Sequence, residues 1–315
     1  MSEDGLPQSA VPPAGVAAGG DEPAADGAVE SREPIITYWA LRLGILGAVL
    51  MLAISIVYER TQAPGCWQTS ISAYFYTPAR SIFVGALIAV GLCLIVIQGR
   101  GRFEDITLNL AGMLAPIVAL VPTSSTGSCY SVLPEPPPTV KESGEVVLAD
   151  WVVANIQNNL FALMLTGLIA VVAAVAFALV HDQPLTEGVK ARTRFGRLTL
   201  SLVISLIVVG LGTALFAFTE LELQAHFLAA ILMFVFLGAA VLVNVLSAAS
   251  PRPYRVAYAA ILAAMLASLL FLLTGWDHSV LIVEILEVAL FSLFWLLQTQ
   301  ELWSRYGNAA AVLAA

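Results

Sequence analysis

Long uncharged apolar runs alternate with short polar segments along the chain from about residue 35 onward. A helix needs roughly 17 to 25 residues, at 1.5 Å per residue, to cross the hydrocarbon core of a bilayer. Eight runs meet this length: about 38–58, 80–98, 106–122, 155–180, 198–219, 224–246, 256–275 and 279–298. They lack the period-two alternation of outer-membrane barrel strands. The pattern therefore predicts an all-α fold, a polytopic transmembrane helical bundle of about eight spans.

Composition agrees with this pattern. Hydrophobic residues make up 59% of the chain and charged residues 11%, and the mean hydropathy is +0.88. A soluble domain carries about twice that charged fraction. The net charge of −8 reflects acidic residues gathered in the first 33 positions, so the remainder has no basic surface for nucleic acid. We therefore expect a lipid bilayer, and no nucleic acid, as a partner.

The distribution of lysine and arginine predicts the orientation. With a cytoplasmic N-terminus, 11 of the 14 basic residues are inside and only Arg60, Arg80 and Lys141 are outside. Omitting the third segment, which contains Pro116, gives 5 inside and 9 outside. Because short cytoplasmic loops carry the excess of basic residues, eight spans with both termini inside fit best. This predicts a multi-pass protein of the inner or plasma membrane.

These features divide the chain into three regions. Residues 1–34 form an acidic tail rich in Ala, Gly and Pro, which we expect to be disordered because it has too little apolar surface to bury. The tail lacks the features of a cleaved signal peptide, so the first span is expected to be retained. Residues 35–302 form the eight-helix transmembrane domain, and 303–315 a short cytoplasmic interfacial tail.

Small residues and cysteines add two structural expectations. Helices in membranes pack through small residues, and the candidates here are Gly44, Gly47, Gly85, Gly91, Gly210 and Gly212. Cys66 and Cys129 lie in predicted outer loops that face an oxidising compartment, which favours a disulfide between them. Cys93 lies inside the second span and is interpreted as a core residue.

Polar residues concentrate on the predicted outer side. Glu284 and Glu287 lie three positions apart inside the last span, on one helical face. A carboxylate at that depth costs on the order of 2.5–3.5 kcal/mol, so both should face the bundle interior. We expect an outward-facing polar ligand pocket built from Glu287, Glu284, Arg80, Tyr74, Tyr76, Ser72, Asn155, Asn158 and His226. A structural pairing of either glutamate with Arg80, a tyrosine or an asparagine is the alternative.

Some of the same residues could also form a metal site. His226, His278, Glu284 and Glu287 are side chains that zinc accepts, but their spacing matches no metal motif. No firm cofactor follows, with zinc as the candidate. Glu104 and Asp105 open the third span, where a helix dipole favours acidic residues, and they are interpreted only in that way.

Three segments carry a resemblance. They are Ser70-Ile71-Ser72-Ala73-Tyr74-Phe75-Tyr76-Thr77-Pro78 before the second span, Asn109-Leu110-Ala111-Gly112 in the third, and His226-Phe227-Leu228-Ala229-Ala230 in the sixth. The chain thereby resembles a family of uncharacterised bacterial multi-pass membrane proteins. The resemblance is good over the first four helices and loose beyond them. It implies the topology and the pocket residues but no reaction.

Three hypotheses follow. The first is a protein that binds or transports a small molecule or lipid through the outer pocket. The second is a structural or accessory subunit with a membrane-protein partner. The third is a metal-dependent membrane hydrolase built on the histidines and glutamates. The sequence favours the first, and an enzymatic activity is not the leading expectation.

Overall fold

The structure is a computed structural model and describes residues 33–62, 66–121, 123, 139–140, 146–147, 150–180 and 222–313. The chain divides into two units, Met1–Trp39 and Ala40–Ala315, and the helical bundle belongs to the second. The elements are α2 (Glu33–Gln62), η1 (Ser72–Tyr76), α3 (Arg80–Val96), α4 (Arg102–Leu120), β1 (Thr139–Val140), β2 (Val146–Val147), α5 (Asp150–Val180), α7 (Glu222–Leu246), α8 (Arg252–Ser268), η3 (Leu269–Thr274) and α9 (Ser279–Leu313). The two-residue strands pair antiparallel, and all other regular elements described are helical.

Six of these helical segments are long and apolar enough to cross a membrane: Ile36–Gln62, Arg102–Leu120, Val153–Ala173, Ala225–Leu246, Arg252–Thr274 and Ser279–Ser304. The apolar helix α3 is shorter, at 17 residues. Every predicted segment except 198–219 coincides with a helix, and that one lies outside the described residues, as does the predicted acidic tail. The helical fold is therefore confirmed, and its six apolar helices are compatible with a multi-pass membrane protein. The count of eight spans and the orientation stay predictions.

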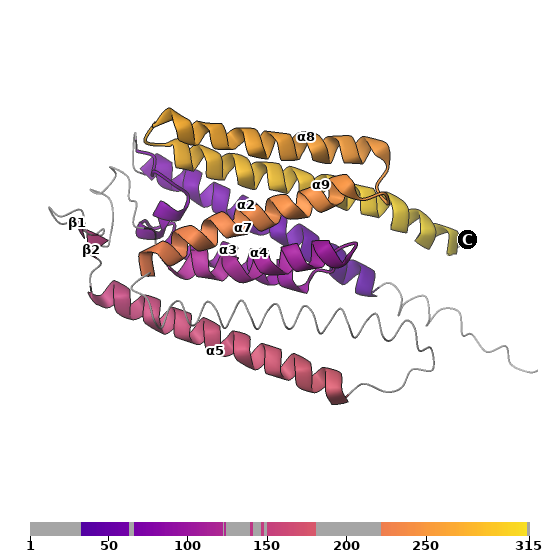
Figure 1. The fold of residues 1–315 in the computed structure, drawn as a ribbon, viewed down its shortest axis with the longest axis horizontal. Helices are drawn as coiled ribbons and strands as arrows, with labels where there is room; N and C mark the ends of the chain where they lie inside the picture. The colour runs from indigo at the N-terminus through magenta and orange to yellow at the C-terminus, as the bar shows by residue number, and fades with distance from the viewer. Residues whose placement is uncertain are drawn as a thin grey trace, which may run out of the picture. The chain divides into compact units, whose positions relative to one another are not determined.

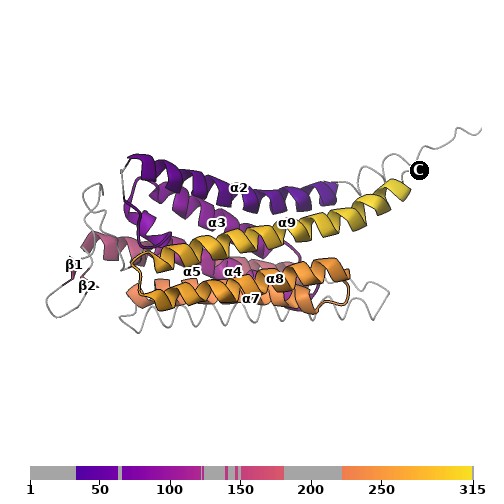
Figure 2. The ribbon, with the colours of Figure 1, turned by 90° about the horizontal axis from the view of Figure 1, so that it is seen from above.

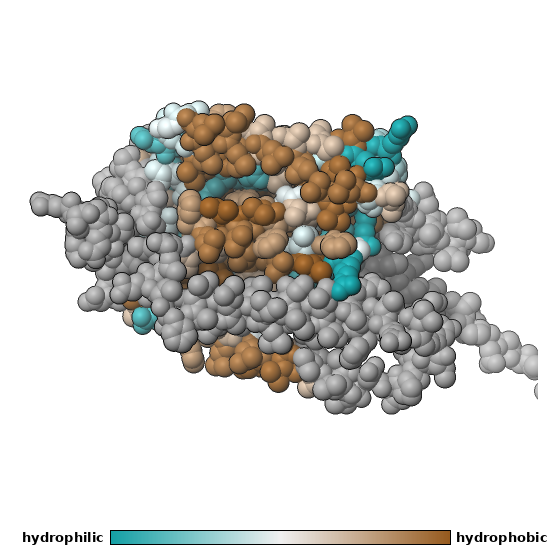
Figure 3. All heavy atoms as spheres, in the orientation of Figure 1, coloured by the Kyte–Doolittle hydropathy of each residue, from teal (hydrophilic) through white to brown (hydrophobic). Residues whose placement is uncertain are grey.

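The helices pack in a chain of neighbours. α3 contacts α4, α4 contacts α7, α7 contacts α8, and α8 contacts α9, while α5 contacts α4 more sparsely. Figures 1 and 2 both show α8 and α9 running side by side. On the face seen in Figure 3, apolar side chains cover most of the middle, and hydrophilic ones gather toward the ends. Exposed Val235, Leu266 and Leu270 on α7, α8 and η3 suit a lipid environment.

Close packing of α3 on α4 depends on two glycines. A Cβ added at Gly91 would lie 2.7 Å from the Gly112 carbonyl oxygen, and one added at Gly112 would lie 2.6 Å from the Gly91 oxygen. Pro116 lies inside α4 and has no N–H to offer the Gly112 carbonyl four residues earlier. The backbones thus meet where a carbonyl has lost its helical partner. The predicted third span is therefore a continuous helix despite its proline.

The other glycines behave differently. Gly44 is close only to the Cys93 sulfur, at 3.9 Å from an added Cβ, whereas nothing lies within 4 Å at Gly47 or Gly85. Gly44 therefore faces α3 without a close backbone approach, and Gly47 and Gly85 mark no helix contact among the described residues. Gly210 and Gly212 lie outside the described residues.

The last helix is longer than predicted. α9 continues to Leu313 instead of ending near residue 298, so the expected interfacial tail 303–315 is mostly helical. Glutamine, glutamate and alanine in this stretch are good helix formers, and no proline interrupts them. The hydrophobic length of a span thus marks where the apolar segment ends, not where the helix ends.

Candidate functional site

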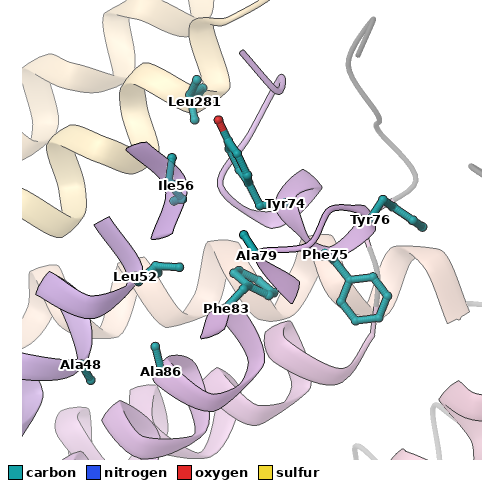
Figure 4. Close-up of a cluster of buried hydrophobic side chains, with 10 residues drawn as sticks. All are labelled: Ala48, Leu52, Ile56, Tyr74, Phe75, Tyr76, Ala79, Phe83, Ala86 and Leu281. Carbon is teal, nitrogen blue, oxygen red and sulfur yellow. The ribbon is translucent and has the colours of Figure 1, made fainter. Parts of the chain in front are cut away.

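The segment between α2 and α3 folds inward onto the bundle. Residues 72–76 form the 3-10 helix η1, and all five side chains are buried. Figure 4 shows the Tyr74 hydroxyl directed toward Leu281 of α9 and Ile56 of α2, with Phe75 and Tyr76 on the other side. We call the end of the bundle formed by residues 66–79 and 275–281 the Tyr74 end.

Glu284 fixes η1 to α9. Its Oε2 accepts a short hydrogen bond from the Ile71 backbone N–H, and the Ser72 backbone also hydrogen bonds to this carboxylate. The Leu281 N–H donates to the Thr69 carbonyl at 3.0 Å. A carboxylate at the start of a short helix satisfies N–H groups that have no partner within that helix. Glu284 therefore has a structural role at the position where the pocket was predicted.

A cavity of about 90 Å³ lies next to Glu284 inside the bundle. Its wall comes from α2, α3, α4, α7 and α9, together with Ile71 and Ser72 before and within η1. Nearly all of the lining is apolar; Phe83, Met233 and Phe291 are among the larger side chains. Glu284 is the one ionisable side chain in this lining. The cavity described is thus mainly apolar, and its polar lining residues are Ser72, Glu284 and Ser292.

Most of the predicted pocket residues lie elsewhere than in this cavity. Only Ser72 and Glu284 line it. The Arg80 guanidinium lies 4.2 Å from the centre of the Phe75 ring, and the Tyr76 hydroxyl donates to the Thr123 carbonyl at 2.8 Å. Asn155 and Asn158 of α5 are exposed. The structure therefore does not bring these residues into one polar pocket.

Tyr74 is the remaining aromatic of the predicted set. It is buried, and its hydroxyl makes no hydrogen bond of standard geometry among the described residues, although the Gln68 backbone lies close. Burial raises the pKa of the Tyr74 hydroxyl; the Gln68 backbone opposes this increase, and the charge of Glu59 adds to it. Tyr74 therefore presents a neutral hydroxyl inside η1.

The predicted zinc ligands are held by separate partners. His226 Nδ1 lies 2.5 Å from the Val121 carbonyl, and His278 Nε2 lies 3.2 Å from that of Trp67. Both carbonyls are acceptors, so each facing nitrogen carries the proton. In the part of the chain that the structure describes, no three His, Cys, Asp or Glu side chains lie close enough to hold a metal.

The disulfide prediction lies partly outside the described residues. Cys129 is not among them, so the structure does not describe a Cys66–Cys129 pair, and the pairing stays a prediction. Cys93 in α3 is a free thiol, as expected for a core cysteine.

Glu287 lies one turn beyond Glu284 and is 5% exposed. Its Oε1 is 2.8 Å from the Ser268 Oγ at the end of α8. The same Ser268 Oγ lies 2.7 Å from the Met265 carbonyl. Among the described residues Glu287 has no ion pair, so neither Arg80 nor a tyrosine is its partner.

A second polar cluster, which the sequence analysis missed, lies at the opposite end. We call it the Arg100 network; its members are Arg42, Arg100, Glu104, Asn244, Ser250, Tyr258, Gln298 and Glu301. Arg100 Nη2 lies 2.6 Å from Glu301 Oε2 in an ion pair, and Glu301 has no exposed surface. The Tyr258 hydroxyl donates to the same oxygen at 2.7 Å. Glu301 is therefore a buried carboxylate with a counter-ion.

The amide side chains connect the rest of the Arg100 network. Gln298 donates to Glu104 Oε1 at 2.5 Å and accepts from Arg42 Nη2 at 2.6 Å. Asn244 donates to Glu104 Oε1 at 2.9 Å. The Arg42 guanidinium also lies 4.0 Å from the centre of the Trp295 ring, a cation–π contact. These bonds tie α2, α4, α7 and α9 together.

The Arg100 network corrects the sequence-based interpretations of Glu104 and Arg42. Glu104 does open α4, but it is 2% exposed and accepts hydrogen bonds from three other segments, so it is more than a dipole partner. Arg42 was counted as a cytoplasmic charge, yet it is buried within α2. Asn244 and Gln298, amides inside apolar runs, were the sequence signal for this cluster, because such groups need buried partners.

Arg100 lies in the loop between α3 and α4. Burial alone would lower the pKa of its guanidinium, but the hydrogen bond and the charge of Glu301 outweigh that effect and raise the pKa above its ordinary value. Its Nη1 also donates to Ser250 Oγ at 2.6 Å. The loop is thereby fastened to the start of α8 and to α9.

Comparison with known proteins gives no assignment. No protein-family model, no curated protein and no solved structure matches the chain.

Proposed function

We propose that the protein binds an amphipathic small molecule or lipid in the membrane, with the apolar part of the ligand in the cavity beside Glu284. The observation that carries this proposal is the cavity itself, which is lined almost wholly by apolar side chains, with Glu284, Ser72 and Ser292 as its polar lining residues. Ligand sites are typically apolar with a few fixed polar groups that orient the ligand. An apolar cavity of about 150 Å³ takes up benzene, so this cavity of about 90 Å³ has room for only a short part of an alkyl chain.

The polar groups suggest how a ligand would be oriented. Glu284 already accepts the Ile71 N–H through Oε2, which holds the carboxylate in place at the edge of the cavity. A hydroxyl or amine of the ligand would then bond to the Glu284 carboxylate, and the alkyl chain would extend toward Met233 and Phe291. The excess of basic residues in the predicted inner loops supports an orientation with this end outside the cell.

A variant that fills the cavity tests the proposal. Ala230 lines the cavity from α7, so Ala230→Phe should weaken binding of a fluorescent fatty-alcohol probe by about tenfold or more, a loss of roughly 1.4 kcal/mol. The measurement is a titration of detergent-purified protein, with native mass spectrometry of co-purified lipid beside it. Ala263 is exposed on α8, so Ala263→Phe is the matched control.

Saturable binding that Ala230→Phe abolishes and Ala263→Phe preserves would support an intramembrane site. Binding that is absent in the wild-type protein, or equal in both variants, would reject the site. In that case the accessory-subunit hypothesis would be the next one to test, by crosslinking in the native membrane.

A further inference from the structure

We infer that Glu287 is a proton-binding site inside the membrane, occupied by a proton in the folded state and buried at the contact of α8, η3 and α9. This inference concerns a different side chain from those that line the cavity, and it does not depend on a ligand there. Three observations support it: the burial of Glu287, the hydrogen bonds of Ser268, and the positions of the charged groups around Glu287.

The hydrogen bonds of the Ser268 hydroxyl indicate whether Glu287 carries a proton. A serine hydroxyl has one proton to donate, yet Ser268 Oγ lies 2.8 Å from Glu287 Oε1 and 2.7 Å from the Met265 carbonyl oxygen. A carbonyl can only accept. If Glu287 were ionised, Ser268 would have to divide one proton between two acceptors. If Glu287 carries a proton, its O–H donates to Ser268, and Ser268 donates to Met265, so both contacts are satisfied.

Burial favours the same state. Glu287 is 5% exposed and Ser268 is 3% exposed. An ionised carboxylate in the membrane interior is costly unless it is paired or hydrated. In the described residues Glu287 has no ion pair and no hydrogen-bond partner besides Ser268. Neutralisation by a proton removes most of that cost.

The charged groups on the elements packed against Glu287 all lie elsewhere. On α8 the ionisable side chains are Arg252, Tyr254, Arg255 and Tyr258; the last of them is ten residues before Ser268, about 15 Å along the helix. η3 has none. On α7, His226 donates to the Val121 carbonyl, and Glu222 opens the helix.

The same holds for the remaining neighbours. On α9, Glu284 is bonded to the Ile71 N–H, and Glu301 is paired with Arg100. At the end of α2, the Arg60 guanidinium lies 5.3 Å from the centre of the Trp67 ring. No cation of a described neighbouring element is therefore positioned to balance an ionised Glu287.

Infrared difference spectroscopy of the protein in nanodiscs tests the assignment. At neutral pH the wild-type protein should show the C=O stretching band of a protonated carboxyl group, which moves on exchange into deuterium oxide. Glu287→Gln should remove this band, and the matched variant Asp277→Asn, at an exposed carboxylate in the turn before α9, should leave it. Ser268→Ala should shift its frequency, because the group loses its hydrogen-bond partner.

Thermal unfolding provides a second readout that does not need the infrared band. The glutamine amide is shaped like the neutral acid and can donate to Ser268, so Glu287→Gln should keep the melting temperature within about 2 °C of wild type. A missing protonated-carboxyl band in the wild-type protein, or a band unaffected by Glu287→Gln, would overturn the proposal. So would a band that Ser268→Ala leaves unchanged. Loss of probe binding in the cavity test would bear only on the proposed function.

Discussion

Glu287 and Glu301 are both buried glutamates on α9, and their surroundings differ in charge. They are separated by fourteen positions, which is about 21 Å along the helix and close to the same face. Glu301 accepts from Arg100, Tyr258 and Ser250, whereas the one hydrogen-bond partner of the Glu287 side chain among the described residues is the Ser268 hydroxyl. One helix thus shows two ways to bury a carboxyl group: with a counter-ion, or as the neutral acid that we propose.

The two ends of the bundle differ in the same manner. At the Arg100 end, charged and amide side chains from α2, α4, α7, α8 and α9 bond to one another. At the Tyr74 end, η1 is held by backbone hydrogen bonds, by Glu284 and by a core of apolar side chains. The cavity lies on the Tyr74 side of the Arg100 network. We expect substitutions in that network to cost stability, and those near the cavity to affect binding first.

Removal of Glu301 should have the largest effect. Glu301→Ala leaves the Arg100 guanidinium, which is 15% exposed, without its ion-pair partner. Breaking a buried pair in this way costs about 3–5 kcal/mol. The measurement is reversible unfolding in mixed micelles. Gln300 is exposed on the same helix, so Gln300→Ala should change the free energy of unfolding by less than about 0.5 kcal/mol.

If Glu301→Ala and Glu287→Gln lowered stability equally, the contrast between the two glutamates would be wrong. Glu287 would then have to be held by an ionic contact as strong as that of Glu301.

Gln298→Leu should have the next effect in size. The substitution removes one donor to Glu104 and one acceptor of Arg42, and a hydrogen bond to a charged group contributes about 1.5–3 kcal/mol. Since Asn244 donates to the same Glu104 oxygen, a double-mutant cycle with Asn244→Leu should show a coupling of about 0.5–3 kcal/mol.

Additive losses in this cycle would mean that the amides act separately rather than as one network. Ser292→Ala is the control for Gln298→Leu, because in the described part of the chain the Ser292 hydroxyl donates only to the Val288 carbonyl within α9. Its expected cost is below about 0.5 kcal/mol.

The helices could be predicted from the sequence, but the polar network could not. A span is defined by the length of an apolar run, a local property, so each predicted segment within the described residues coincides with a helix. The contact of Arg42 with Gln298 joins residues 256 positions apart. A single sequence gives no register between such helices. Topology counting treated Arg42 only as a cytoplasmic charge, because it considers the sign of a charge and not its partner.

The candidate site shows the same limit. The pattern placed Glu284 and Glu287 correctly on a buried face of the last span, because an unpaired charge in lipid is costly once it loses its hydration. It did not distinguish their roles: Glu284 accepts a hydrogen bond from the backbone N–H of Ile71, just before η1, whereas Glu287 is hydrogen bonded to Ser268 of α8. The cavity could not be predicted at all, because its shape depends on side chains from five helices at once.

Tyr258→Phe is the smallest change and separates the parts of the Glu301 site. It deletes one hydroxyl that donates to Glu301 at 2.7 Å and leaves the ring, which packs 5.2 Å from the Phe294 ring centre. A hydrogen bond to a charged group contributes about 1.5–3 kcal/mol. Because Arg100 still neutralises Glu301 after the change, we expect a loss near 1.5 kcal/mol, less than for Glu301→Ala. Tyr254 makes no side-chain hydrogen bond among the described residues, so Tyr254→Phe is the control. A loss from Tyr258→Phe as large as that from Glu301→Ala would show that the tyrosine hydroxyl, and not the arginine charge, holds the glutamate in place.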